Sequence, residues 1–383
     1  MRLSVVVVVY DMPHAAPRTL TTLSPAFQRG LDDDYEIIVV DNGSPRPMPV
    51  DRVERLGANV RYLSLAHPQP SPAAAANCGL ALASGDVVGL ILDGARLATP
   101  RLLEFAWRAA TSHPRAVVST VGWLLGYGSP ERHASADDAE AAMRTEAILA
   151  SIDWPRDPYR LFEVARLDGS MGYFGLGFES GAFFMPRALW RELDGLDERF
   201  DVPGGGFAAL DLYARAHALP DCEPMLLLGE GTVHQPHGGV STDRPIEDLA
   251  QRFMRWREHY IALRGHDLPL RTPPLTYFGS LPAPWRVQFL AWLVRETASE
   301  SPALADLVPR VAGALAAAPT PQGTAWAELY AAQSILLEAR QAAADAATES
   351  AGLRARVQAL EGSWSWRLTA PLRWLATRLG SRA

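Results

Sequence analysis

Uninterrupted apolar runs recur along the first part of the chain, and segments with helical spacing separate them. Residues 3–10 (LSVVVVVY) and 35–40 (YEIIVV) are rich in β-branched residues that do not alternate with polar ones. Such runs are typical of strands buried on both faces of a sheet. Further strands are predicted at residues 59–64, 87–92, 116–121, 181–185 and 223–229.

Helical spacing and helix start signals predict helices between these strands. They are expected at residues 18–31, 73–83, 100–111, 137–152, 186–193, 208–218 and 245–263. Residues 154–178 and 234–239 are predicted to be loops. Strands that alternate with helices indicate an α/β fold, with a mostly parallel, Rossmann-like sheet flanked by helices.

The character of the chain changes after residue 264, where we place the end of the first domain. Residues 265–323 are rich in Pro and Ala and are interpreted as a helical extension and linker. Residues 324–361 predict one long helix whose weak heptad pattern would suit a coiled coil and a homo-oligomer.

Residues 362–383 predict a basic amphipathic tail. A helix would gather Leu368, Leu372, Leu375 and Leu379 on one stripe, beside arginines and tryptophans. Two interpretations stay open, a segment that binds a membrane surface and a helix that docks onto protein.

Composition narrows the classes of function. The 383-residue chain has a net charge of −7 and a pI near 5.8, which argues against a nucleic-acid-binding surface spread over the chain. Cys78 and Cys222 fit a reducing compartment better than a disulfide framework. Neither a signal peptide nor an apolar run of about 18 residues is found. We therefore expect a cytoplasmic protein, with the tail as its means of peripheral contact with the inner membrane.

Polar residues follow the predicted strands at the edge where parallel sheets bind ligands. Tyr10 and Asp11 follow the first strand, Asp41 follows the second, and Asp93 follows the strand at residues 87–92. Ligands bind beyond the carboxyl ends of strands in such sheets. These residues are therefore the first candidates for a binding site.

Four segments resemble, in the same order, the GT-A fold glycosyltransferases of the large inverting family 2. They are SVVVVVYDMPHAAPRTLTTL, YEIIVVDNGSP, NCGLALASGDVVGLILDGARLATPRLL and SGAFFMPRALWRELDGLDERFDVPGGGFAALDLYARA. The resemblance covers about residues 1–263 and implies a GT-A domain over residues 1–264 that binds a nucleotide-sugar. A narrower bacterial subgroup with D-G-A-R in place of D-x-D resembles this chain further. The tail phrase WSWRLTAPLR resembles the ends of bacterial surface-polysaccharide glycosyltransferases, which implies a glycan or lipid-linked acceptor.

The resemblance assigns nucleotide contacts. It implies that Asp41 accepts a hydrogen bond from the base or ribose, that Tyr10 and Asp11 line the same pocket, and that Asn77 braces it. The alternatives are an Asx turn for Asp41 and an ordinary polar helix position for Asn77.

Asp93 matches the first carboxylate of the family's motif, but the residues after it depart from that motif. The family's strand ends in D-x-D, which binds a divalent metal on the donor phosphates, whereas this chain has Ala95 in place of the last carboxylate. Either His234 supplies a second ligand for Mg²⁺ or Mn²⁺, or Arg96 brings positive charge to the phosphates. His237, three residues after His234, could join it or be a loop histidine, and Arg96 could merely cap a turn.

The catalytic base is the least defined assignment. The family's acidic pair after the glycines is reduced here to Asp211, and the usual catalytic position is Ala209. Asp211 and Glu179 are both candidates; the alternative for Asp211 is a favourable charge near a helix N-terminus. We expect an inverting hexosyl- or deoxyhexosyltransferase that serves bacterial cell-surface polysaccharide synthesis. The alternative is an impaired relative that binds nucleotide-sugar or glycan as a scaffold.

Overall fold

The computed structural model describes residues 2–31, 34–49, 51, 53, 55–126, 138–154, 156–167, 181–237, 246–269 and 275–280. The chain divides into two compact units, Met1–Leu281 and Pro282–Ala383, and every described residue belongs to the first. The helix predicted at residues 324–361, the tail at 362–383 and Glu179 lie outside the described residues.

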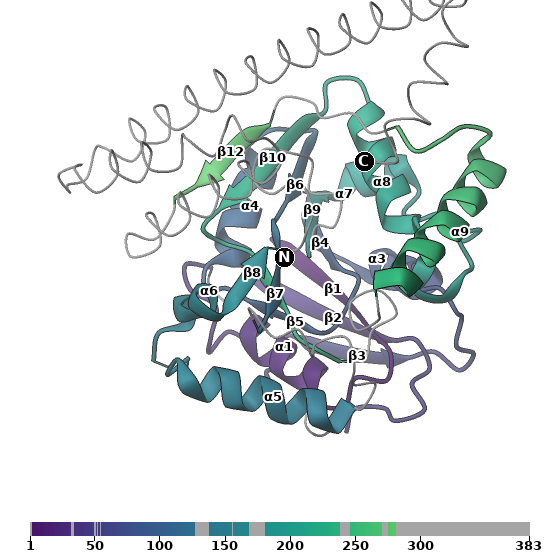
Figure 1. Ribbon diagram of the computed structural model, residues 1–383. Coiled ribbons are helices and arrows are strands. Elements are labelled where there is room, and N and C mark those ends of the chain that lie inside the picture. Colours follow the sequence, from purple (N-terminus) through teal and green to yellow (C-terminus); the bar gives the residue numbers. More distant parts are fainter. Residues whose placement is uncertain are drawn as a thin grey trace, which may run out of the picture. The chain divides into compact units, whose positions relative to one another are not determined.

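An eight-stranded sheet forms the centre of the first unit (Figure 1). Its order is β12 (Thr276–Gly279), β10 (Glu223–Leu228), β6 (Ala116–Ser119), β9 (Phe183–Pro186), β4 (Val87–Ile91), β1 (Leu3–Val9), β2 (Tyr35–Asp41) and β3 (Val60–Ser64). Strand β9 runs antiparallel to both of its neighbours, and the other paired strands are parallel. The predicted α/β fold with a mostly parallel sheet is confirmed.

Alternate side chains of β1 enter two separate hydrophobic layers. Val5 and Val7 pack with α1 (Ala15–Leu23) and α4 (Leu102–Ser112) on one face of the sheet. Val6 and Val8 pack on the other face with helices from later in the chain. These helices are α3 (Ala73–Leu82), α7 (Arg187–Leu193) and α8 (Ala208–Ala218). Because every residue of β1 is buried, the strand needs the unbroken apolar run that the sequence shows.

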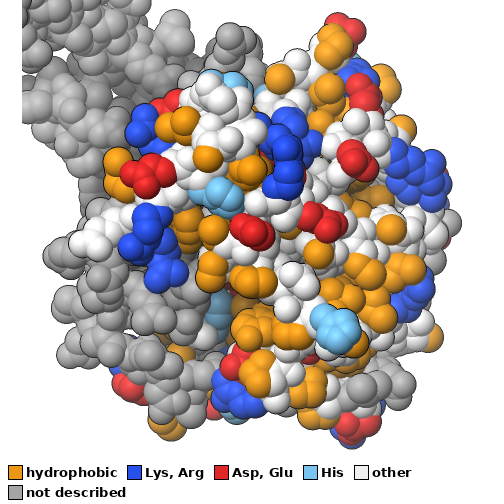
Figure 2. All heavy atoms as spheres, turned by 90° about the vertical axis from the view of Figure 1, so that its right-hand side faces the viewer, with side chains coloured by type: hydrophobic (Ala, Val, Ile, Leu, Met, Phe, Trp, Pro, Cys, Tyr) orange, Lys and Arg blue, Asp and Glu red, His pale blue; other side chains and the backbone are white. Residues whose placement is uncertain are grey.

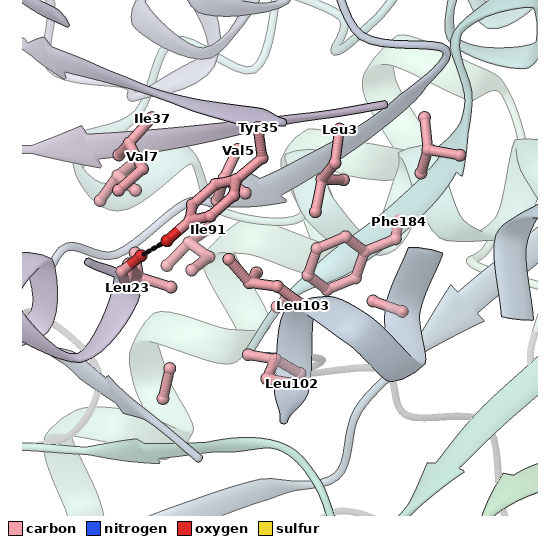
Figure 3. Close-up of a cluster of buried hydrophobic side chains, with 14 of the residues drawn as sticks. Leu3, Val5, Val7, Leu23, Tyr35, Ile37, Ile91, Leu102, Leu103 and Phe184 are labelled. Carbon is pink, nitrogen blue, oxygen red and sulfur yellow. Dashed lines mark hydrogen bonds between the residues drawn. The ribbon is translucent and has the colours of Figure 1, made fainter. Parts of the chain in front are cut away.

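Buried polar groups in the layer between β1, α1 and α4 find partners within it, and the Tyr35 hydroxyl is an example. The Tyr35 hydroxyl donates to the Leu23 carbonyl at 2.7 Å while its ring packs beside Leu3 and Val5 (Figure 3). A buried hydroxyl without a partner costs free energy, so this bond lets a tyrosine occupy the core. It also fixes the C-terminal end of α1 against the sheet.

Helix α1 differs from its prediction at both ends. It begins at Ala15 rather than at residue 18 and ends at Leu23 rather than at residue 31. Pro17 lies in the first turn, where no backbone N–H is needed. Pro25 forces the preceding residue out of the helical region, and Ser24 indeed has ψ 156°.

A second, four-stranded sheet was not predicted. Its order is β5 (Arg96–Ala98), β11 (Thr232–His234), β7 (Gly122–Leu125) and β8 (Ala165–Leu167). Strands of three or four residues are too short to show a period. The loop predicted at 234–239 begins one residue later than expected, because His234 is the last residue of β11. The region predicted as a loop at 154–178 contains α6 (Leu161–Val164) and β8.

The remaining described elements complete the surface of the unit. They are α5 (Asp138–Ser151), α9 (Ile246–Arg264) and the 3-10 turns Pro158–Arg160 and Pro203–Gly205. Strand β12 pairs with β10, so the large sheet includes a strand beyond residue 264, where the sequence placed the end of the first domain. Within the described ranges, no helix combines the length and apolar character needed to cross a membrane.

Charges are dispersed on the face of the described part that Figure 2 presents. Arg side chains are interspersed there with acidic and apolar ones rather than gathered in one broad area. This face therefore lacks the broad basic patch that marks a nucleic-acid-binding surface, in line with the negative net charge.

Candidate functional site

Asp93 lies just beyond the carboxyl end of β4, in the turn that leads to β5. Its Oδ1 accepts a hydrogen bond from the Ala95 backbone N–H at 2.9 Å. Such an Asx turn holds the carboxylate in one orientation. The second oxygen, Oδ2, is thereby directed toward two histidines.

His234 and His237 come from the end of β11 and the loop that follows it. The Nε2 of His234 lies 2.8 Å from Asp93 Oδ2 and 3.0 Å from the Nε2 of His237. The Nε2 of His237 lies 3.3 Å from the same Asp93 oxygen. The side chains of His234 and His237 are 2% and 7% exposed, and that of Asp93 is 29% exposed. Three potential ligand atoms thus lie close together, and Asp93 is the residue of the three that solvent reaches most.

Gln235 joins the two loops through its backbone and ties them to α1 through its side chain. Its N–H donates to the Ala95 carbonyl at 2.7 Å. Its side-chain amide donates to the Ala15 carbonyl at 3.1 Å and to Thr19 Oγ1 at 3.2 Å. His234 itself pairs across the sheet with Arg96 of β5. The site is therefore built on paired strand ends that fix its geometry.

The surroundings set the protonation of this cluster. Burial alone would raise the pKa of Asp93, but its interactions with His237 and His234, which include the hydrogen bond to His234 Nε2, outweigh burial and hold that pKa well below its usual range. Burial lowers the pKa of His234, and the charge of Arg96 acts in the same direction. An ionised carboxylate and a neutral imidazole are the states in which these side chains bind metal.

The ligand atoms fit a divalent metal ion. Two ligands at right angles around an ion with bonds of about 2.1 Å lie about 3.0 Å apart. The separations of 2.8, 3.0 and 3.3 Å between the three atoms bracket that value. Among the described residues, these are the only three His, Cys, Asp or Glu side chains whose ligand atoms come this close together.

Arg96 adds a cation next to the cluster. Its Nη1 is buried and has no hydrogen-bond partner within the described part of the chain, and the same holds for Thr232 Oγ1. Both atoms face Gly181, where an added Cβ would lie 3.0 Å from Arg96 Nη1. A buried guanidinium nitrogen without a partner is costly, and an anionic ligand is the kind of group that would satisfy it.

Asp41, Asp11 and Tyr10 lie together at the ends of β2 and β1. Asp41 is 1% exposed; its Oδ1 accepts from the Ser44 N–H at 2.7 Å and its Oδ2 from the Tyr62 hydroxyl at 2.5 Å. The Asp11 N–H donates to Ser44 Oγ at 2.8 Å. Asp41 thus forms the Asx turn that was its alternative interpretation, while it shapes the loop beside Tyr10, which is 49% exposed.

Sequence reasoning missed two partners in this group. The Arg46 guanidinium pairs with the Asp11 carboxylate at 2.8 Å. Burial, together with hydrogen bonding to Asp41, raises the pKa of Tyr62, so its hydroxyl stays a donor to that carboxylate. The motif Asp-Asn-Gly-Ser could have signalled Ser44, but nothing local links Asp41 to Tyr62.

Asn77 has a structural set of contacts. Its Nδ2 donates to the Leu196 carbonyl and to Glu198 Oε1, each at 2.9 Å, and its Oδ1 accepts from the Leu196 N–H at 2.9 Å. These bonds join α3 to the turn after α7. They occupy the whole amide, which matches the alternative of a polar position that holds the helix in place.

Asp211 is enclosed by cations. It is 1% exposed, and its carboxylate accepts from Arg215 Nε at 2.7 Å and from Arg264 Nε and Nη2 at 2.6 and 2.7 Å. Arg264 also pairs with Asp197 at 2.8 Å. Both oxygens of this carboxylate are already occupied by guanidinium donors, so this geometry speaks for the charge-pairing role of Asp211 rather than for the base.

Comparison with known proteins finds a family match for the N-terminal part of the chain. Residues 4–157 match the family model described as glycosyl transferase family 2. No curated protein matches the chain. The matched segment runs from β1 to the end of α5 and contains Asp41, Asp93 and Arg96, but not the two histidines.

Two solved structures illustrate the similarity in fold. A crystal structure of S. aureus TarS 1-349 is 16% identical, with 79% of this chain and 73% of that chain covered and a TM-score of 0.39. Glucosyl-3-phosphoglycerate synthase from Mycobacterium tuberculosis, solved with Mn²⁺, uridine diphosphate and glucosyl-3-phosphoglycerate, is 17% identical, with 72% and 88% covered and a TM-score of 0.41. These similarities are too low to transfer a ligand or an activity.

Proposed function

We propose, from the glycosyl transferase family 2 domain that residues 4–157 carry, that this chain transfers a sugar from a nucleotide-sugar donor to an acceptor hydroxyl. The observation that carries the proposal is the meeting of Asp93, within that domain, with His234 at 2.8 Å. This meeting occurs at the carboxyl end of the parallel strands, where such sheets bind nucleotides.

The donor is proposed to lie across the ends of β2, β1 and β4. Tyr10, Asp11 and Asp41 would contact the nucleoside end; Asp41 would do so partly by shaping the loop at Ser44. The diphosphate would then reach Asp93, where Nη1 of Arg96, which has no partner among the described residues, would offer hydrogen bonds to phosphate oxygens. A guanidinium is suited to phosphate because its donors match the phosphate geometry.

Asp93 and His234 are the proposed ligands of a divalent metal. Such an ion, when bound, neutralises charge that develops on the leaving diphosphate. The protein contributes the fixed positions of the ligands, through the Asx turn at Ala95 and the bonds of Gln235. Arg96 would share the same task from the side of Gly181.

Glu179 remains the candidate base, because Asp211 is paired with Arg215 and Arg264. A single in-line displacement assisted by one base inverts the anomeric centre. The proposed acceptor is a glycan or lipid-linked hydroxyl in the synthesis of bacterial surface polysaccharide, on the basis of the tail phrase alone.

Release of nucleoside diphosphate from a panel of UDP-, GDP- and dTDP-sugars, with Mn²⁺ and a glycan acceptor mixture, tests the proposed function. Asp93→Asn should abolish turnover, whereas Asp86→Asn, an exposed change at the opposite end of β4, should not. If no donor is transferred or hydrolysed while nucleoside diphosphate still binds, the transferase proposal fails.

A nucleotide-sugar-binding scaffold is the second candidate. The pairing of Asp211 with two arginines favours it, because that carboxylate is the one acidic residue retained from the family's usual acidic pair. Mutation of Glu179 separates the candidates. A Glu179→Gln chain that transfers sugar as fast as the unchanged chain would remove the proposed base, and an unchanged chain that binds the donor without any transfer would support the scaffold.

The tail and the helix at 324–361 are proposed to bring the enzyme to the inner membrane and to a second copy of itself. Flotation with anionic vesicles tests the first point. Binding that Leu375→Glu abolishes would support membrane contact, and equal flotation of both chains would count against it. Light scattering of the full chain tests the homo-oligomer.

A further inference from the structure

We infer that the metal centre of this chain is a two-histidine, one-carboxylate site, with His237 as its third ligand, and that it selects Mn²⁺, Co²⁺ or Zn²⁺ over Mg²⁺. The inference deepens the proposed function and rests on it for the role of the ion. It concerns which ion the chain binds, which can be measured without any sugar transfer.

His237 has the position of a ligand. Its Nε2 lies 3.0 Å from that of His234 and 3.3 Å from Asp93 Oδ2. The two imidazole rings are nearly perpendicular, at 84°, with centroids 5.0 Å apart. Rings turned in this way bring their Nε2 atoms together without stacking, so both nitrogens and the carboxylate oxygen form one triangular face.

The carboxylate contributes a single oxygen to that face. Asp93 Oδ1 is already bonded to the Ala95 N–H at 2.9 Å, which leaves Oδ2 for an ion. The residue that would offer a second carboxylate in a D-x-D motif is Ala95, which is 0% exposed. The described protein ligands are therefore two nitrogens and one oxygen.

This donor set decides between ions. Mg²⁺ prefers oxygen ligands and is usually held by carboxylates together with phosphates and water. Imidazole suits later divalent metals, whose affinity for a given nitrogen and oxygen site rises from Mn²⁺ through Co²⁺. Two histidines with one carboxylate on one face is the arrangement of several transition-metal enzymes, and it leaves the opposite positions open for phosphate oxygens.

The electrostatic surroundings add to this selection. Arg96 pairs with His234 across the small sheet and so brings its positive charge next to the site. A nearby cation repels a metal ion and lowers its affinity for a site that binds by charge attraction alone. Covalent character in nitrogen–metal bonds offsets that repulsion for later metals and does so less for Mg²⁺.

Metal titration of the full chain, stripped with a chelator and free of nucleotide, tests the inference. Calorimetry with Mn²⁺, Co²⁺, Zn²⁺ and Mg²⁺ should give tighter binding of each of the first three than of Mg²⁺, by at least about tenfold. The visible spectrum of the Co²⁺ form reports the ligands directly, because loss of a nitrogen donor changes its bands.

Three variants locate the third ligand. His237→Ala should weaken Co²⁺ and Zn²⁺ binding by at least about tenfold and change the Co²⁺ spectrum. His237→Asp should bring the affinities for Mn²⁺ and Mg²⁺ closer together, because an oxygen ligand replaces a nitrogen ligand. His266→Ala, an exposed histidine at the end of α9, is the matched control and should change neither. Circular dichroism checks that each variant is folded.

Three results would overturn the inference. The first is Mg²⁺ binding as tight as that of Mn²⁺ in the unchanged chain, and the second is Co²⁺ affinity and spectrum that His237→Ala leaves unaltered. The third is absence of binding for all four ions. Because no donor sugar is present, these outcomes leave the transferase proposal to be judged by its own assay.

Discussion

The backbone N–H of Gln235 donates to the carbonyl of Ala95 at 2.7 Å and so joins the loop after β11 to the loop after β4. One of the two loops carries Asp93, and the other begins directly after His234 and carries His237. The relative position of the proposed ligands thus depends on a residue that is not itself a ligand.

Gln235→Ala keeps this backbone bond but removes the side-chain bonds that tie the loop to α1, and it should loosen the site without removing a ligand. The side chain is 0% exposed and bonds to Ala15 and Thr19, so its loss should cost about 1–3 kcal/mol of folding free energy. Metal affinity should fall as well, while nucleoside binding near Asp41 stays unchanged. Urea unfolding measures the loss of stability, and calorimetry measures the metal affinity. Unchanged metal affinity in a destabilised chain would contradict the role of the Gln235 side chain in positioning the ligands.

Ala95→Asp should not restore a D-x-D site. Ala95 is 0% exposed, and burial of a carboxylate without a partner is strongly unfavourable. We expect a lower melting temperature and no gain in Mg²⁺ affinity. Ala66→Asp, an exposed change in the loop after β3, serves as the control. A stable Ala95→Asp chain with raised Mg²⁺ affinity would contradict this expectation, because it would show that a carboxylate at residue 95 can reach the metal ion.

Arg96→Met should weaken binding of nucleoside diphosphate by at least about tenfold, because one charge-assisted hydrogen bond to phosphate contributes about 1.5–3 kcal/mol. Arg96→Lys should recover only part of this loss, since an ammonium keeps the charge without the planar pair of donors. Titration with UDP, GDP and dTDP measures the change. Arg55→Met, at an exposed ion pair with Asp51, is the comparison, and equal effects of the two Met variants would argue against a phosphate contact of Arg96.

Asp211→Asn separates a structural role from a catalytic one. The change leaves Arg215 without its counter-charge and Arg264 with Asp197 alone, at a carboxylate that is 1% exposed, and breaking a buried pair costs about 3–5 kcal/mol. At a temperature where the variant stays folded, turnover should remain within about tenfold of the unchanged chain. A loss of about 10²–10⁴ in a folded variant would instead identify Asp211 as the base.

Glu36 should make folding stability depend on acid pH. Burial alone would raise the pKa of Glu36, but hydrogen bonds from Ser84 and Ser4 outweigh burial and lower it. A pKa that is lower in the folded chain adds stability above the unfolded pKa, and this stability is lost as pH falls through the folded pKa. Urea unfolding between about pH 6 and pH 3 should show a shallower decline for Glu36→Gln, and parallel declines would refute the assignment.

The large sheet could be predicted because its strands are apolar runs with strong local signals. The small sheet could not, since β5 and β11 have three residues each and exist only because they pair with each other and with β7. The same limit applies to the site. Asp93 was predictable from its place after a strand, and Arg215 lies one helical turn from Asp211, but Arg264 reaches Asp211 across 53 residues. Only the folded chain brings such partners together.

The antiparallel strand β9 has a consequence for how the chain is made. It lies between β4 and β6, yet residues 183–186 leave the ribosome only after both neighbours and all of the family-matched segment 4–157. Until then β4 and β6 each present an unpaired edge, and open edges invite pairing with other chains. We expect a nascent or truncated chain that ends near residue 157 to aggregate or to require chaperones. Any minimal catalytic fragment should therefore extend past β9.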